Sequence, residues 1–250
     1  MPRLNTSTNL SQHKLPTGHY GYSAVRLDQL GASEYTLVTI VQDVSSSVSD
    51  FKKEMEAALK EVITACKFSP RADNLMIRFV QFNQKLTESH GFKLLEQCNP
   101  DDYNDCLNIG GMTALFDSAE NAVQATIDYA KQLAANDFNV NAIVFIITDG
   151  CDNESVMNAQ DVKKATAAAM KEESLESVVS VLIAVGMQDP GSKQALDNFH
   201  KQAGITQFID VGDANAKTLA KLAAFISKSI SAQSQSLGTG GASNQLSLYL

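Results

Sequence analysis

Long apolar runs are missing from this sequence of 250 residues. No stretch approaches the roughly 20 consecutive apolar residues that a helix needs to cross a bilayer. The first residues, Met1 to Gln12, also lack the apolar block of a secretory signal. We therefore expect a protein without a membrane span that works in the cytoplasm.

Positive charge is scarce as well. The chain has 20 Lys and Arg residues against 28 Asp and Glu residues, which gives a formal net charge of -8. Nucleic-acid binding needs a surplus of basic side chains to neutralise phosphates, and this chain has none. Acidic membrane surfaces are disfavoured for the same reason, so we expect neither nucleic acid nor membrane as a partner.

Cysteine and histidine are few and show no ligand spacing. No CxxC pair occurs, so the sequence suggests neither a zinc ribbon nor a disulfide framework, and we expect reduced thiols. The four cysteines are Cys66, Cys98, Cys106 and Cys151.

The composition is that of one globular α/β domain, with 44% hydrophobic and 19% charged residues. Residues 1–33, with Pro2, Pro16 and several glycines, are predicted to be an N-terminal arm. Residues 34–231 form the predicted domain. Residues 232–250 lack charge and are rich in Ser, Gln and Gly, which predicts a flexible C-terminal tail.

Within the domain, apolar runs alternate with helical patterns. Such alternation predicts a doubly wound, mainly parallel central sheet flanked by helices, Rossmann-like in layout, with one antiparallel edge strand at 92–95. The other strands are predicted at 37–41, 75–82, 142–147, 178–185 and 207–211. Helices are predicted at 51–66, 115–133, 162–169, 190–200 and 219–230.

Oxygen-bearing side chains follow the most apolar strands, where folds of this class bind ligands. Asp43, Ser45 and Ser47 come after the first strand, Asp149 follows the strand at 142–147, and Thr113 lies in a glycine-rich loop before a helix. Two carboxylates and three hydroxyls are hard donors that suit Mg²⁺, Mn²⁺ or Ca²⁺ and poorly suit zinc. A divalent cation would also offset the repulsion between the carboxylates.

The pattern Asp43-x-Ser45-x-Ser47, then Thr113, then Thr148-Asp149-Gly150 resembles the metal-ion-dependent adhesion site (MIDAS) of von Willebrand factor A (vWA) domains. The first motif alone is common, but three elements in order within a matching strand and helix layout are specific. The resemblance covers roughly residues 35–231 and includes every ligand position of the site.

The resemblance implies roles for these residues. Ser45 and Ser47 would ligate the metal directly, and Asp43 and Asp149 would act mostly through hydrogen bonds or water. Thr113 would change between direct and water-mediated contact when a partner binds. Met112 and Cys151 are departures, because the family more often has small residues beside these positions.

The implied function is divalent-metal-dependent protein binding rather than catalysis. A cation held by few charges and several neutral hydroxyls stays electron-poor, so an exposed Asp or Glu of a partner can complete its coordination shell. Small intracellular proteins of this family resemble components that work beside AAA+ ATPases or in stress-response and phage-related complexes, which by analogy suggests an adaptor role.

Acidic residues surround the predicted site, and they have two interpretations. They are either a recognition rim for basic groups of the partner or a solvated edge with no binding role. The residues are Asp50, Asp101, Asp102, Asp105, Asp152 and Glu154.

Other interpretations of the five site residues stay open. Ser47 and Thr113 could only cap helices, and the two aspartates could only stabilise turns. A bound metal could serve stability alone. The chain could also be a metal-dependent phosphohydrolase or phosphotransfer enzyme of a Rossmann-like fold, although Ser45 stands where such enzymes need a second carboxylate.

Overall fold

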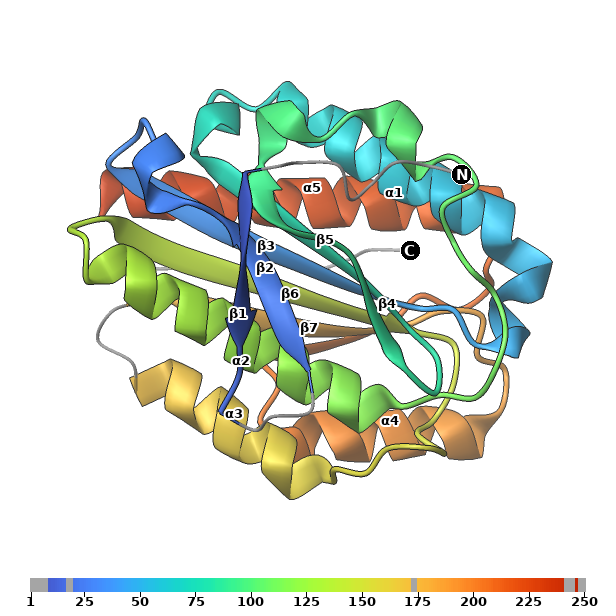
Figure 1. The fold of residues 1–250 in the computed structure, drawn as a ribbon. Helices are drawn as coiled ribbons and strands as arrows, with labels where there is room; N and C mark the ends of the chain where they lie inside the picture. Colours follow the sequence, from blue (N-terminus) through green and yellow to red (C-terminus); the bar gives the residue numbers. More distant parts are fainter. Residues whose placement is uncertain (1–8, 17–19, 172–174, 241–245, 247–250) are drawn as a thin grey trace.

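The computed structural model describes residues 9–16, 20–171, 175–240 and 246. It contains one twisted sheet in the strand order β1-β2-β5-β4-β3-β6-β7-β8, with helices on both faces (Figure 1). The predicted fold class is confirmed, because the central strands are parallel and strands alternate with helices along most of the chain.

The elements match the predicted order. The parallel strands are β3 (Glu34–Asp43), β4 (Leu75–Phe82), β6 (Asn139–Thr148), β7 (Val178–Ala184) and β8 (Gln207–Asp210). The helices are α1 (Lys52–Lys67), α2 (Leu115–Ala134), α3 (Ala159–Lys171), α4 (Pro190–Ala203) and α5 (Ala216–Thr239). No helix in the described ranges has both the length and the apolar character that a bilayer span requires.

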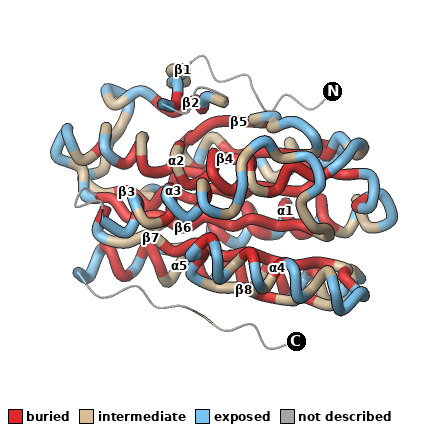
Figure 2. The backbone as a smooth tube through the Cα atoms, turned by 90° about the horizontal axis from the view of Figure 1, so that it is seen from below, coloured by how far each residue is buried: buried red, intermediate tan, exposed pale blue. Residues whose placement is uncertain are grey.

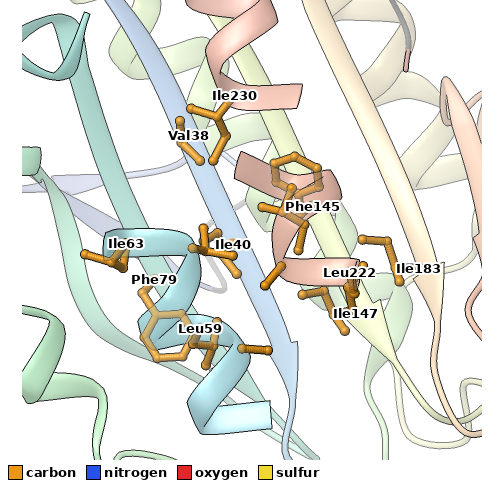
Figure 3. Close-up of a cluster of buried hydrophobic side chains, with 14 of the residues drawn as sticks. Val38, Ile40, Leu59, Ile63, Phe79, Phe145, Ile147, Ile183, Leu222 and Ile230 are labelled. Carbon is orange, nitrogen blue, oxygen red and sulfur yellow. The ribbon is translucent and has the colours of Figure 1, made fainter. Parts of the chain in front are cut away.

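Apolar faces of the helices cover the sheet on both sides. Helices α1 and α5 lie on one face, where Leu59 and Ile63 of α1 and Leu222 of α5 pack against side chains such as Ile40 of β3 (Figure 3). Helices α2, α3 and α4 cover the other face (Figure 1). The central strands are therefore buried along nearly their whole length (Figure 2). Double-sided burial explains why these strands read as continuous apolar runs.

The segment predicted as an N-terminal arm contributes two strands to the sheet. β1 (Leu10–Lys14) pairs antiparallel with β2 (Gly21–Val25), and the pair forms one edge of the sheet. β2 joins β5 (Leu86–Leu94) through the register pair of Ala24 with Phe92. Thus the strand predicted at 92–95 corresponds to the end of β5, which is antiparallel to β4 as predicted but lies inside the sheet. Leu95 already belongs to the 3-10 helix η4 (Leu95–Gln97). The two strands were not predicted because each has only five residues, too few for a clear alternation of polar and apolar side chains.

Close backbone contact and a buried charge network attach this hairpin. A Cβ atom at Gly91 would lie 2.0 Å from the Ser23 carbonyl oxygen, so only glycine fits beside β2. Glu88 accepts hydrogen bonds from the Ser23 backbone N–H at 2.9 Å and from Arg78 Nε at 2.7 Å. Arg78 also donates to Asn121 Oδ1 of α2 at 2.9 Å. The fully buried Arg78 therefore links β2, β4, β5 and α2.

At the other end, α5 continues through Thr239, beyond the predicted domain boundary at residue 231. Gln233 donates to the carbonyl oxygen of Ala142 at 3.2 Å, and Ser234 Oγ accepts from Arg71 Nε at 3.0 Å. The polar residues that suggested a tail thus face hydrogen-bonding partners on the sheet side of a helix. Beyond Gly240, the predicted tail lies outside the described residues except for Leu246, which packs against the core.

His90 of β5 generates a prediction for the dependence of stability on pH. Its Nδ1 atom lies 3.0 Å from the Gly91 carbonyl oxygen, which can only accept, so Nδ1 donates. Nε2 then accepts from the Tyr103 hydroxyl at 2.7 Å. Burial lowers the pKa of His90 to about 3. The folded state therefore holds neutral His90, whereas the unfolded chain takes up a proton near pH 6.5.

The stability that this difference contributes is present above pH 6.5 and is lost as the pH falls towards 3. We measure the free energy of unfolding with urea at pH 7.5 and at pH 5.0. Between these two values the wild type should lose about 2 kcal/mol more of this free energy than His90→Gln loses. The matched control is His200→Gln, which replaces a partly exposed histidine on α4 and should keep most of the pH dependence. Equal pH dependence in the wild type and His90→Gln would contradict the assignment.

Candidate metal centre

Three loops meet at the carboxyl edge of the parallel strands. β3 and β6 are neighbours in register up to Gln42 and Ile147, so the residues that follow these two positions lie side by side. Thr148 Oγ1 donates to Asp43 Oδ2 at 2.6 Å, which places Asp149 beside Asp43. The third loop joins them through Gly110 N–H, which donates to the Val44 carbonyl oxygen at 2.8 Å.

The first loop turns its oxygens towards one point. Asp43 is fully buried and its Oδ1 accepts from the Ser45 backbone N–H at 2.8 Å. The Ser45 and Ser47 hydroxyl oxygens lie 3.1 Å apart. Ser47 and Ser45 also favour the charged form of Asp149 and so oppose the rise that burial causes in its pKa. Asp43, Ser45 and Ser47 are thus joined by hydrogen bonds, and Asp149 lies beside them.

Thr113 reaches the same group from the third loop. Its side-chain oxygen lies 3.9 Å from the position of a Cβ atom at Gly150, the residue after Asp149. Its backbone N–H donates to Asn153 Oδ1 at 2.8 Å, and its carbonyl oxygen accepts from Asn153 N–H at 3.0 Å. The structure therefore brings all five predicted residues to one edge of the sheet.

The site hydroxyls do not cap helices. The 3-10 helix η2 (Ser46–Phe51) begins after Ser45 and α2 begins after Ala114, and neither of these cap residues makes a side-chain hydrogen bond that caps its helix. Ser155 Oγ instead accepts from the N–H groups of Phe116 and Asp117 in the first turn of α2. The capping interpretation of Ser47 and Thr113 is therefore wrong.

Several supporting residues were missed from the sequence. Gly111 has a φ of +87°, and the Gln84 side-chain oxygen occupies the place of its missing Cβ atom. The same oxygen accepts from Met112 N–H at 3.2 Å, while Asn83 Nδ2 donates to the Gly110 carbonyl oxygen at 2.6 Å. Asparagine and glutamine directly after β4, close in space to a glycine pair, were the available signal.

The electrostatics of the two carboxylates favour a cation. Burial raises the pKa of Asp43 to about 6 with a further contribution from the charge of Asp149 included, and hydrogen bonds from Thr148 and Ser45 oppose the rise. Burial also raises the pKa of Asp149, whose Oδ1 atom is buried without a hydrogen-bond partner among the described residues. Two crowded carboxylates with an unsatisfied oxygen fit a hard divalent cation.

Hydroxyl oxygens are essential to this donor set. Within the part of the chain that the structure describes, no three Asp, Glu, His or Cys side chains gather in a geometry that could hold a metal. A cation at this edge would have two carboxylates and would take the rest of its shell from neutral oxygens such as the Ser45 and Ser47 hydroxyls and water.

Comparison with known proteins gives likeness in structure only. No family model matches the chain. No curated protein matches it either. Among solved structures, the minor pilin PilB from Streptococcus sanguinis is similar at 13% identity and a TM-score of 0.54. That match covers 87% of this chain and 66% of PilB.

Two further structures are similar. Proximal thread matrix protein 1 (PTMP1) from the mussel byssus, solved with zinc occupying its MIDAS motif, gives 20% identity and a TM-score of 0.51 over 78% of this chain and 46% of PTMP1. The pilus adhesin SpaC from Lactobacillus rhamnosus GG gives 8% identity and a TM-score of 0.56 over 92% of this chain and 37% of SpaC. This chain therefore spans less than two thirds of each of these proteins. The similarity concerns the fold, which is like that of vWA domains.

Proposed function

We propose that this protein binds a divalent cation through Asp43, Ser45, Ser47, Thr113 and Asp149, and through that cation an exposed Asp or Glu of a partner protein. The convergence of these five oxygen-bearing side chains from three loops carries the proposal. The buried, unpartnered Oδ1 atom of Asp149 supports it, because a cation would satisfy that oxygen.

The five residues would have different roles in metal binding. Asp43 is held by Thr148 and by the Ser45 backbone, so its charge stays fixed at the centre of the site. Following the vWA resemblance, Ser45 and Ser47 would contact the ion directly, and Thr113 would respond to the partner. The bound ion supplies a coordination position that a carboxylate can fill.

The similar structures support binding rather than catalysis, since their names are those of a pilin, a pilus adhesin and a matrix protein. We propose Mg²⁺ as the metal, with Mn²⁺ or Ca²⁺ as substitutes. Because PTMP1 was solved with zinc in its MIDAS, a test of metal binding must also include Zn²⁺. An adaptor role beside an AAA+ ATPase or in a stress or phage-related system, and a cytoplasmic location, remain part of this proposal.

Metal binding is tested by titrating the protein with Mn²⁺ and following the free ion by electron paramagnetic resonance, with Mg²⁺, Ca²⁺ and Zn²⁺ as competitors. We expect Asp149→Asn and Asp43→Ala each to weaken Mn²⁺ binding at least about tenfold, since each removes one of two carboxylates. Asp137→Asn, an exposed change at the opposite end of the sheet, is the control and should bind like the wild type.

Stability should respond in opposite directions with and without metal. At a free Mn²⁺ concentration 100 times the dissociation constant, the wild type should gain about 2.7 kcal/mol in free energy of unfolding. Metal-free Asp149→Asn should be at least as stable as the metal-free wild type, because it removes a partly buried charge on a carboxyl group whose pKa is raised. A marked loss of stability in that variant would show that the charge serves the fold, and the metal centre would be rejected.

Partner binding is tested by capture from a lysate with Mg²⁺ or with chelator, followed by substitution of each exposed acidic residue of the captured protein. Thr113→Ala should retain most Mn²⁺ affinity and lose capture, since the resemblance gives Thr113 its role when a partner binds. Capture that survives both chelator and Asp43→Ala contradicts the proposal. Hydrolysis of a phosphate ester that disappears in Asp43→Ala would instead identify an enzyme.

A further inference from the structure

A hollow of about 460 Å³ adjoins the candidate metal centre. Ser47 and Asp149 of the centre form one of its walls. The remaining wall comes from the loops that precede α1, α4 and α5. The hollow and the metal centre therefore share two side chains, and one bound segment can reach both.

The lining of the hollow has two chemical parts. Phe51, Met187 and Ala214 provide apolar surface around Gly186. A Cβ atom at Gly186 would lie 3.5 Å from the ring of Phe51 and 3.3 Å from Ala214, so glycine keeps these groups close together. Apolar surface within a charged rim is suited to a side chain that has both an aliphatic stem and a charged head.

The charged part is entirely acidic. Asp50, Asp189 and Asp213 line the hollow, and its described lining includes no Lys, Arg or His. None of the ion pairs between described residues involves these three aspartates. The nearby Lys193 is paired with Asp210 at 2.7 Å. The rim carboxylates therefore lack a cationic partner within this part of the protein.

Two of these carboxylates are held in place. Asp189 accepts from the Ser192 hydroxyl at 2.8 Å and from the Ser192 backbone N–H at 2.7 Å, and these bonds lower its pKa, so it stays ionised at neutral pH. Asp213 accepts from Gln188 Nε2 at 2.7 Å. Fixed carboxylates lose little conformational entropy when a cation binds between them.

We propose that this hollow receives a Lys or Arg side chain from the same partner segment that supplies the acidic residue to the metal. This inference rests on the proposed function. The aliphatic stem would lie on Phe51 and Met187, and the charged head would lie among Asp50, Asp189 and Asp213. The partner is thus a segment with one acidic and one basic residue a few positions apart.

The test selects random 12-residue peptides displayed on phage against the folded protein in Mg²⁺, with elution by chelator. In the double variant Asp50→Asn/Asp213→Asn the rim loses two charges and keeps its shape. The matched control is Asp73→Asn/Asp137→Asn, which makes the same charge change at exposed positions at the opposite end of the sheet. Mn²⁺ affinity is measured for each protein beforehand.

The wild type and the control should enrich peptides with Asp or Glu and a nearby Lys or Arg, and the double variant should lose the preference for the basic residue. For one selected peptide, replacing its Lys by norleucine should weaken binding to the wild type about threefold to tenfold and to the double variant less than about twofold.

The outcomes separate the two proposals. If peptides elute with chelator and carry an acid but no basic preference, or if the double variant keeps that preference, the hollow has no such role and the metal site stands. If no peptide binding depends on metal, the proposed function fails and this inference fails with it. A second Mn²⁺ ion whose binding the double variant abolishes would also overturn it, because the carboxylates would then hold a metal.

Discussion

Two carboxylates at the ends of adjacent parallel strands set the main constraint on this structure. Asp43 and Asp149 are brought together because β3 and β6 are neighbours in register and both end at the same edge. Their burial and mutual repulsion raise the pKa of Asp43, which marks a local cost in free energy. The chain tolerates this cost because hydrogen bonds from Thr148 and Ser45 hold Asp43, and a large apolar core holds the strands.

The surrounding loops leave the remaining site oxygens available. If Ser47 and Thr113 capped helices, their lone pairs would be occupied by backbone N–H groups. Here the first turn of α2 is capped from another loop by Ser155, and the backbone of Thr113 is fixed by Asn153. Because Ser155 caps α2 from another loop, the stability of this helix does not depend on the hydroxyl of Thr113.

The sequence predicted the centre of the molecule better than its ends. Strands buried on both faces, such as β6, are long apolar runs whose assignment needs no tertiary information. β1 and β2 escaped prediction because each has five residues, and their attachment depends on Gly91 and on the ion pair of buried Arg78 with partly buried Glu88, which are distant in sequence from these strands. The part of α5 beyond residue 230 escaped because most of its buried side chains, those of Gln233, Ser234 and Ser236, are polar.

The same distinction applies to the candidate metal centre. Its five oxygen donors follow strands or precede a helix, so their convergence was predictable once a parallel sheet was assumed. The supports Asn83, Gln84 and Asn153 were not predictable, because each acts on the backbone of a loop that only the fold brings near. Acidic residues were recognised around the site, but only Asp50 of that set lines the hollow, since Asp189 and Asp213 come from loops far along the chain.

The hydrogen bonds that fix these loops can explain how a contact as small as one carboxylate on a metal could be selective. A single carboxylate on a metal buries little area, so affinity and selectivity depend on how little the site must reorganise. Backbone bonds from Gly110 to Val44 and from Ser46 to Gly111 join the loops before any ligand arrives. With a fixed metal position beside a fixed acidic hollow, binding would depend on the distance between an acidic and a basic side chain of the partner. Such a geometric requirement can discriminate among the many exposed acidic residues that any protein surface presents.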